Sequence, residues 1–546
     1  MQLNLSELRG NFIAGTTTSF ILIPQAMAYA TVAGLAPYHG LYASILPLIA
    51  YAIVGRSRQM AVGTGALDAL LVGSAIAGLG VMEESDKAAW AAVLAFEVAA
   101  IQVALGFLRA GFLTNFLAQP VLAGFTSAAA LIIGFSQLHK LMGFPGKAGA
   151  TLIELALQFF RNLQNIHWLT SALGLICIGA LILIKKRVKQ IPGPLLVVVI
   201  GILMAMLLGL EDQGIEIVGF IPSGLPMPKL PGVTLEGAIQ LLPMALTIAL
   251  IGYLTMISIA RSFADRNGYE LNGNQELFGA GAANFAAGIT QGFPIAASFS
   301  RSAVHAGAGA TSRYALVFTA AWVVLTLLLL ASFLSYLPVT VLAAIIMQSV
   351  FGLVDVKAFK RLRKLGTTDV YLFITTFLAT ITLGVEIGIL TGVAVSIMFF
   401  LYETSRPHTA ILGRIPGSTH FRNVKNYPDV ETYPGLSILR FDAQFYFANS
   451  SFFKELIRDL ERNDDLRMII IDASSLIRID SSAEATLDAI ATRLAEKKID
   501  LAFAAAKMPV LRVLMASGLY DRIGKDNFYM DVDQAVSAFQ KQKTRR

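Results

Sequence analysis

The stretch of sequence that decides the fold is QGFPIAASFSRS, residues 291–302. A proline, several small hydroxyl residues and Arg301 interrupt a chain that is otherwise apolar enough for lipid. A charge within a membrane-spanning segment is costly, and such residues usually serve a function. Arg301 is therefore the first candidate for a binding site.

The composition places most of the chain in a membrane. Of its 546 residues, 55% are hydrophobic and only 14% are charged, and the mean hydropathy is +0.65. Runs apolar enough to cross ~30 Å of hydrocarbon recur from residue 11 to about residue 404. We expect a polytopic α-helical membrane protein followed, from residue 405, by a small globular domain.

Apolar segments predict fourteen spans, some of them too short to cross a membrane alone. They cover about 11–30, 38–55, 64–80, 88–108, 114–138, 168–184, 193–210, 238–260, 275–292, 298–308, 314–334, 336–354, 368–385 and 387–404. Basic residues such as those of 357–364 fall in alternate connections, and acidic ones such as those of 83–86 fall in the others. This pattern predicts that both termini are cytoplasmic. The loops also account for the net charge of +7, so we expect contacts with lipid headgroups and not with nucleic acid.

Two of these spans are interrupted in comparable ways. The sequence VGTGALD, residues 62–68, and the residues from Pro294 to Ser302 each precede a short apolar stretch. They fall in the third span of the first seven and the third of the second seven. Matched interruptions are typical of inverted repeats, in which two half-helices point their positive ends into one cavity where an anion can bind. The alternative is a pair of glycine-rich packing contacts, and Arg301 favours the binding site.

Five stretches carry a resemblance to a known family. They are IPQAMAYA (23–30), GLAPYHGLYAS (34–44), QPVLAGFTSAAA (119–130), GYELNGNQEL (268–277) and SFSRS (298–302). In this order they resemble the sulfate permease (SulP) anion transporters, the family that includes prestin. The resemblance implies a membrane domain over residues 1–404, built as two inverted seven-helix repeats at about 11–210 and 238–404. It also implies a core and a gate domain, a homodimer, and a cytoplasmic STAS domain.

The resemblance also implies the residues of an anion pocket, which in the family lies between the starts of spans three and ten and beside span one. In this chain those residues are Gln25, Tyr29, Gly65, Ser298, Phe299, Ser300 and Arg301. Hydroxyls and amides are neutral donors, whereas the charge of an arginine does not titrate away. Helix packing is the alternative role for the two aromatic residues.

One position departs from the family. Many bacterial and plant relatives carry a carboxylate in span eight that is linked to ion coupling, but Thr255 stands there in this chain. Two other acids fall within spans, Asp68 in the first turn of span three and Glu97 near the middle of span four. Our hypothesis is that Asp68 has taken over proton coupling. An ion pair with Arg301, or a contact with the helix dipole, is the alternative, and we expect Glu97 to be a structural hydrogen-bond partner.

Residues 433–546 alternate between strands and helices, which predicts a small α/β domain after a linker at 405–432. The expected strands are Leu436–Phe441, Gln444–Phe447, Met468–Asp472 and Asp500–Ala505, and the expected helices are Ser450–Glu461, Ser482–Glu496, Pro509–Ser517 and Val532–Gln540. Asp480 is expected to cap a helix. Ser481 beside it resembles the phosphorylated serine of anti-sigma-factor antagonists. The domain shows no catalytic, metal or cofactor motif, so a regulatory or dimer-supporting role is expected.

Together these observations predict a secondary active transporter of small anions, with sulfate as the first choice, and not an enzyme. Exchange of bicarbonate, chloride or a dicarboxylate, and uncoupled channel-like conduction, are alternatives within transport. A sensor that signals through the STAS domain is an alternative of another class. The expected partners are the anion, membrane lipid, a second copy of the chain and a cytoplasmic protein at the STAS domain. The expected location is a bacterial inner membrane.

Overall fold

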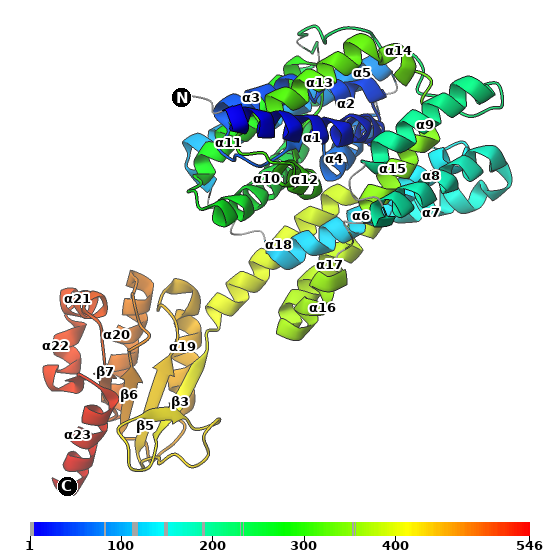
Figure 1. The fold of residues 1–546 in the computed structure, drawn as a ribbon. Helices are drawn as coiled ribbons and strands as arrows, with labels where there is room; N and C mark the ends of the chain where they lie inside the picture. Colours follow the sequence, from blue (N-terminus) through cyan, green and yellow to red (C-terminus); the bar gives the residue numbers. More distant parts are fainter. Residues whose placement is uncertain are drawn as a thin grey trace. The chain divides into compact units, whose positions relative to one another are not determined.

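The computed structural model describes residues 5–80, 83–111, 118–146, 151–187, 192–229, 231–232, 234–351, 354 and 356–545. The chain divides into two compact units, Met1–Ser396 and Ile397–Arg546. The first unit is mostly helical, and the second is built on a β-sheet (Figure 1). Each unit has hydrophobic clusters of its own.

The first unit begins with α1 (Leu5–Val32), α2 (Pro37–Tyr42), α3 (Leu46–Val54), the two-residue strand β1 (Val62–Gly63), α4 (Ala66–Gly78) and α5 (Glu84–Phe107). Then come α6 (Gln119–Met142), α7 (Leu152–Arg161), α8 (Trp168–Arg187), α9 (Gly193–Leu208), α10 (Leu235–Asn267) and α11 (Gly273–Ile289). It continues with β2 (Ala296–Ala297), α12 (Phe299–Gly307), α13 (Ala315–Leu329), α14 (Ala331–Leu334), α15 (Val339–Val350), α16 (Val356–Leu365), α17 (Thr367–Leu383) and α18 (Val385–Ser405).

Every apolar segment predicted from the sequence contains a helix. Five helical stretches of the described residues are long and apolar enough to cross a membrane: Pro37–Val54, Ser85–Phe107, Gln119–Met142, Leu235–Asn267 and Ile387–Ser405. Several other apolar helices, including α4, α13 and α15, are shorter. The amphipathic helices α7 and α16 were not predicted. Each has a polar face, so its sequence contains no continuous apolar run.

The helices of the first unit pack into two groups. In the core group, α11 packs on α3 and α5, α10 packs on α5, and α1 packs on α2, α12 and α13. In the gate group, α6 packs on α15 and α17, and α8 packs on α9 and α15. The groups meet where α1 contacts α9 and α15, and where α4 contacts α6 (Figure 1). Helix α1 therefore touches both groups.

The second unit contains a six-stranded sheet in the order β4-β3-β5-β6-β7-β8. Its strands are β3 (Thr409–Arg414), β4 (Phe421–Asn423), β5 (Leu436–Phe441), β6 (Met468–Asp472), β7 (Asp500–Ala504) and β8 (Phe528–Tyr529). Strands β5 to β8 run parallel, whereas β3 is antiparallel to β4 and β5. The helices are α19 (Phe447–Leu460), α20 (Ser481–Glu496), α21 (Met508–Ala516), α22 (Leu519–Ile523) and α23 (Val532–Arg545).

Alternating side chains of the strands divide this unit into two cores. Phe441 and Ile471 pack with Phe453 of α19 and Leu487 of α20. Ile438 and Ile470 lie on the same strands, three residues from Phe441 and one residue from Ile471, and they pack with Val536 of α23. Because successive strand residues point to opposite faces, α19 and α20 lie on one face of the sheet and α23 lies on the other.

Two expectations for this unit need correction. The predicted strand Gln444–Phe447 is wrong, because only Phe445 forms a bridge, to Ile479, and helix α19 begins at Phe447. The expected linker 405–432 supplies β3 and β4 to the sheet. Ala410 and Leu412, two residues apart in β3, are both buried. Apolar residues at alternate positions are typical of a strand, but this pattern was not recognised in the sequence.

Candidate anion-binding site

The two interrupted spans meet inside the core group. Val62 of β1 pairs with Ala297 of β2, and Gly63 pairs with Ala296, in an antiparallel register. Helices α4 and α12 begin a few residues after these strands. The predicted breaks are therefore confirmed, and the amino ends of the two short helices lie beside one two-stranded pairing.

The N-terminus of α12 is fixed by its own serines. The Ser298 side chain caps the helix and accepts a hydrogen bond from the backbone N–H of Arg301 at 3.5 Å. The Ser302 hydroxyl accepts a hydrogen bond from the backbone N–H of Ala61 at 2.9 Å. The first contact satisfies a donor that the start of a helix leaves free. The second fastens the helix to the segment that leads into α4.

Arg301 is the largest fully buried side chain of the structure, with 1% of its surface exposed. Its guanidinium donates to the carbonyl oxygens of Thr64, at 3.1 Å, and Ala61, at 3.5 Å. A Cβ on Gly63, whose φ is +148°, would stand 3.1 Å from Nη2 of Arg301, so only glycine lets the backbone come this close. Arg301 forms no ion pair and its Nε has no hydrogen-bond partner among the described residues. Its guanidinium is thus in contact with carbonyl dipoles and not with a described carboxylate.

Helix α1 brings further polar groups to the same region, because it packs on both α4 and α12. Gln25 follows Pro24, which lies inside the helix, and Tyr29 lies one turn further on. Both side chains are buried, and Oε1 of Gln25 has no hydrogen-bond partner among the described residues. The hydroxyl of Thr64, before α4, is likewise buried without a described partner. Buried polar groups without partners are rare and call for a ligand or water.

The remaining predicted residues differ in exposure. Gly65 is the N-cap of α4. Ser300 is exposed, with its hydroxyl 3.2 Å from that of Ser298. Phe299 is 53% exposed, so packing between helices does not explain its side chain in this unit.

Asp68 is 5% exposed in the first turn of α4. A Cβ on Gly65 would stand 2.4 Å from its Oδ2, and a Cβ on Gly252 of α10 would stand 3.7 Å from its Oδ1. The carboxylate therefore lies over the amino end of its own helix and faces α10. Asp68 and Arg301, both described, form no ion pair within 4.0 Å, so the alternative of a direct structural pair is not what the structure contains.

The other two coupling candidates differ from Asp68. The Thr255 hydroxyl donates to the carbonyl of Ile251 one turn back in α10, at 3.0 Å. Glu97 is half-buried in α5, and its Oε2 has no hydrogen-bond partner among the described residues. The expected structural hydrogen bond of Glu97 is therefore not present at this oxygen.

Several residues that support the site were missed in the sequence. Asn284 of α11, fully buried, accepts from the N–H of Ile295 at 2.8 Å and donates to its carbonyl at 3.2 Å. Asn284 also donates to Gln102 of α5, at 3.0 Å. His39 contacts the carbonyl of Gln291 at 2.6 Å. These side chains hold both ends of the segment that leads into α12. The presence of Asn284 and Gln102 in apolar helices was a signal that could have been noticed. Their contacts, however, join residues far apart along the chain and leave no local sequence pattern.

His305 lies one turn beyond Arg301 on α12 and is fully buried. The Thr18 hydroxyl donates to the carbonyl of Ala14 at 2.7 Å and lies 2.7 Å from Nδ1 of His305. The direction of the hydrogen bond between Thr18 and His305 depends on the tautomer of the imidazole ring. The opposite nitrogen, Nε2, has no partner among the described residues. This contact fastens α12 to α1.

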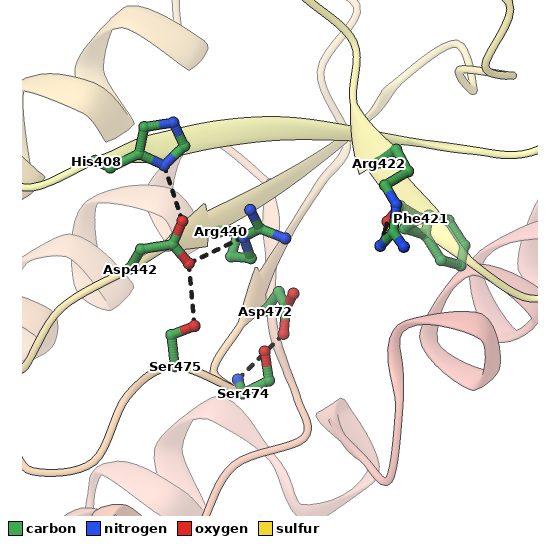
Figure 2. Close-up of polar contacts among 8 residues, drawn as sticks. All are labelled: His408, Phe421, Arg422, Arg440, Asp442, Asp472, Ser474 and Ser475. Carbon is green, nitrogen blue, oxygen red and sulfur yellow. Dashed lines mark hydrogen bonds and ion pairs between the residues drawn. The ribbon is translucent and has the colours of Figure 1, made fainter. Parts of the chain in front are cut away.

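In the second unit, a polar cluster lies at the carboxyl ends of β5 and β6 (Figure 2). Asp442 accepts hydrogen bonds from His408 at 2.8 Å and from the Ser475 hydroxyl at 3.0 Å, and it forms an ion pair with Arg440 at 2.9 Å. Burial alone would raise the pKa of Asp442, but the hydrogen bonds from His408 and Ser475 and the charge of Arg440 hold this pKa below its ordinary value. Asp442 is therefore ionised at neutral pH and joins the start of β3 to the sheet.

We expect Asp442→Asn to lower the free energy of unfolding of this unit by about 1–2 kcal/mol at pH 7. This is below the about 1.5–3 kcal/mol of a buried hydrogen bond to a charged group, because Asp442 is partly exposed and solvent screens its charge. A carboxyl whose pKa is lower in the folded than in the unfolded state stabilises the fold above its unfolded pKa of about 4. The difference in the free energy of unfolding between wild type and variant should therefore shrink as the pH falls through the lowered pKa of Asp442. Hydrogen exchange of β5 and β6 in the full chain measures it.

Asp459→Asn is the matched control, because the Asp459 side chain is 62% exposed and pairs only with the exposed Arg462. Exposed pairs contribute little, so this variant should exchange like the wild type at every pH. Equal effects of the two substitutions would contradict the stabilising role of Asp442.

The segment around Ser481 forms a helix start. Asp480 caps α20 by accepting from the N–H of Ala483 at 2.8 Å, as predicted. Asp480 also accepts from the N–H of Phe447 at 3.0 Å. Ser481 is the first residue of the helix and is exposed, so its hydroxyl can be reached from solvent.

Comparison with known proteins follows the division of the chain. The sulfate permease family matches residues 8–376, and the STAS domain matches residues 427–535. The chain is 34% identical to a probable sulfate transporter of Mycobacterium tuberculosis, over 98% of this chain and 96% of the relative. It is also 34% identical to the chloroplastic sulfate transporter 4.1 of Arabidopsis thaliana, over 96% of this chain and 79% of the relative.

Solved structures show the same fold. The murine anion transporter Slc26a9, in its inward-facing state, superposes with a TM-score of 0.91 at 24% identity and covers 99% of this chain and 92% of its own. The transmembrane domain of a cyanobacterial bicarbonate transporter gives a TM-score of 0.63 at 20% identity, over 72% of this chain and 98% of its own. This protein is thus a multi-pass membrane protein with a C-terminal STAS domain. By the length of the match and the identity to its relatives, the chain belongs to the sulfate permease family.

Proposed function

We propose that this chain is a secondary active transporter of small inorganic anions, with sulfate as its substrate. The observation that carries the proposal is the buried guanidinium of Arg301, which two carbonyls hold and no described carboxylate contacts. The amino ends of α4 and α12 lie beside it, and helix amino ends carry partial positive charge. An anion bound here would offset the positive charge of Arg301.

The chemistry of the pocket supports a weakly held oxyanion. Gln25, Ser298 and the free backbone N–H groups at the starts of the two helices are neutral donors, and Arg301 adds one fixed charge. A site of this kind can release its ion, as transport requires. Sulfate is preferred because the relatives that match most of this chain are named as sulfate transporters.

We further propose that transport proceeds by an elevator-like movement of the core group against the gate group. The anion site lies wholly on core helices, and the groups meet along α1 and α4. In this proposal the two inverted repeats are residues 11–210 and 238–404, the protein is a homodimer in a bacterial inner membrane, and both termini are cytoplasmic. The STAS domain, 433–546, has a regulatory role, with Ser481 as its candidate site.

Uptake into proteoliposomes tests the substrate. The purified chain should accumulate labelled sulfate with saturation at rising concentration, and excess unlabelled sulfate should compete better than chloride or bicarbonate. A current that rises linearly with anion concentration would instead indicate a channel. If bicarbonate or chloride competed more strongly than unlabelled sulfate, that anion would be the substrate instead of sulfate.

Asp68 is the proposed proton-coupling residue. It is buried beside the anion site and faces the helix that carries Thr255. Protonated Asp68 would lower the electrostatic cost of a nearby dianion, whereas ionised Asp68 would repel it. We therefore expect wild-type uptake to rise as the external pH falls. Asp68→Asn, which keeps the shape of the protonated form, should give uptake that hardly changes with pH.

Glu97→Gln is the matched control for this prediction, because it removes a second acid from a neighbouring membrane helix. It should retain the pH dependence of the wild type. An unaltered profile in Asp68→Asn would remove Asp68 from coupling, and a flat profile in Glu97→Gln would assign coupling to Glu97 instead.

A further inference from the structure

A second cationic site lies in the core group, apart from the anion site. A cavity of about 1010 Å³ opens among the start of α1 and the loops that follow α3, α10 and α12. Its lining includes Arg56, Arg58 and Arg313. None of these three arginines forms an ion pair with a described carboxylate. The cavity therefore presents three guanidinium groups whose charges no acid neutralises by contact.

The loop that carries Arg56 and Arg58 is held in place by hydrogen bonds from its backbone to a buried carboxylate. The buried carboxylate of Glu276 accepts from the backbone N–H groups of Arg56 at 2.8 Å and Ser57 at 2.9 Å. The hydroxyl of Tyr51 donates to the same carboxylate at 2.6 Å. The buried carboxylate of Glu276 thus binds the backbone of this loop, and neither arginine side chain forms an ion pair with a described carboxylate. Preorganised donors bind an anion at a lower entropic cost.

The other walls are fixed as well. Arg313 donates to the carbonyl of Gly55, which ties its loop to the first one. Asn11, almost fully buried in α1, accepts from the N–H groups of Thr311 and Ser312, both at 3.0 Å. Helix α11 begins at the cavity with the Asn272 cap, so its positive end adds to the field.

The aromatic residues of the cavity indicate its level in the membrane. The guanidinium of Arg58 lies 5.0 Å from the centre of the Tyr269 ring, and Tyr269 donates to Gln59 at 3.0 Å. Tyr314, 44% exposed, lines the opposite loop. Tyrosines at the ends of membrane helices are typical of the headgroup region. These tyrosines are consistent with a cavity at the level of the phospholipid phosphates.

We propose that this cavity binds a phosphate group, that of a membrane phospholipid headgroup. Arginine forks match phosphate oxygens in a bidentate manner, and the cavity is much larger than a bare tetrahedral oxyanion but suits a headgroup. Glu7 and Glu270 also line it, which disfavours a highly charged polyanion and suits the hydroxyl or amino groups of a headgroup. A free phosphate ion would satisfy the same arginines, so the test distinguishes the two sources.

Native mass spectrometry of the full chain in detergent, titrated with phosphatidylglycerol, tests the proposal. We expect the combined variant R56Q/R58Q/R313Q to bind this lipid at least about tenfold more weakly than the wild type, since charge-assisted contacts are lost. The control R361Q/R363Q/K364Q removes the same number of charges from the exposed residues of α16 and should bind like the wild type.

Two further arms complete the experiment. Inorganic phosphate added as a competitor should leave the lipid bound, whereas displacement of the lipid by phosphate would support the phosphate site with a soluble ligand. If the combined variant does not fold, Arg58→Gln alone, which removes only the guanidinium over Tyr269, should still weaken lipid binding. Equal lipid binding by wild type, the combined variant and the α16 control overturns the proposal, as does equal binding by a folded Arg58→Gln in that case.

Discussion

Arg301→Ala is expected to reduce the initial rate of sulfate uptake at least about tenfold, because it removes the positive charge buried at the anion site. A hydrogen bond to a charged group contributes about 1.5–3 kcal/mol, and about 1.4 kcal/mol corresponds to a tenfold change in binding. The substitution also removes one donor each from the carbonyls of Thr64 and Ala61. Uptake should therefore fall at every sulfate concentration.

Two variants separate the roles of charge and geometry. Arg301→Lys keeps the positive charge, but an ammonium group lacks the planar fork that reaches both carbonyls, so its uptake should lie between those of the alanine variant and the wild type. Arg361→Gln removes a charge from the exposed surface of α16 and should leave uptake unchanged.

Binding can be measured without transport. Sulfate should raise the thermal unfolding midpoint of the wild type, because a ligand that binds only the folded state stabilises it, and this rise should vanish in Arg301→Ala. A folded Arg301→Ala protein that keeps both the rise and the uptake would contradict the proposed site.

The sequence predicted most of what the local chain decides. Pro294, the serines and Arg301 predict that this span is interrupted and that its helix begins after the interruption. Helix α12 does begin at Phe299, with Ser298 as its N-cap. Strands β5 and β6 lie at the residues where alternating and continuous apolar runs placed them. These features depend on the nearest few residues, so a single sequence contains them.

What the sequence did not predict depends on distant contacts. Asn284 and Gln102 meet across helices α11 and α5, and nothing near either residue indicates the other. Strand β3 forms by pairing with β5. The residues Gln444–Phe447 were predicted as a strand, but Tyr446 is the N-cap of α19 and the helix begins at Phe447. Tertiary context decided these elements, as it commonly does for short strands.

The second large effect is expected at Gly40, where α2 crosses α1. A Cβ on Gly40 would stand 1.9 Å from the carbonyl oxygen and 2.4 Å from the carbonyl carbon of Ala26. Both are backbone atoms of α1, so no side chain can rotate to relieve the clash. Small residues allow this approach of helix backbones in membranes. Gly40→Ala therefore requires the two helices to separate.

We expect Gly40→Ala to lower the free energy of unfolding by about 3 kcal/mol or more, at the upper end of the cost of overpacking. Gly179→Ala is the matched control, because a Cβ there meets nothing within 4 Å in the middle of α8. Alanine favours a helix over glycine by about 1 kcal/mol, so this variant should unfold at the wild-type temperature or above. Thermal unfolding of the purified proteins compares the two.

The position of the clash also predicts a functional effect in any Gly40→Ala protein that remains folded. Ala26 directly follows Gln25, so a displaced α1 moves the Gln25 amide away from the segment that holds Arg301. Sulfate uptake should then require a higher sulfate concentration for half-saturation, because contacts to the bound anion are lost before the fold is. A Gly40→Ala protein with the stability and the half-saturation of the wild type would show that α1 does not need this close crossing to place Gln25.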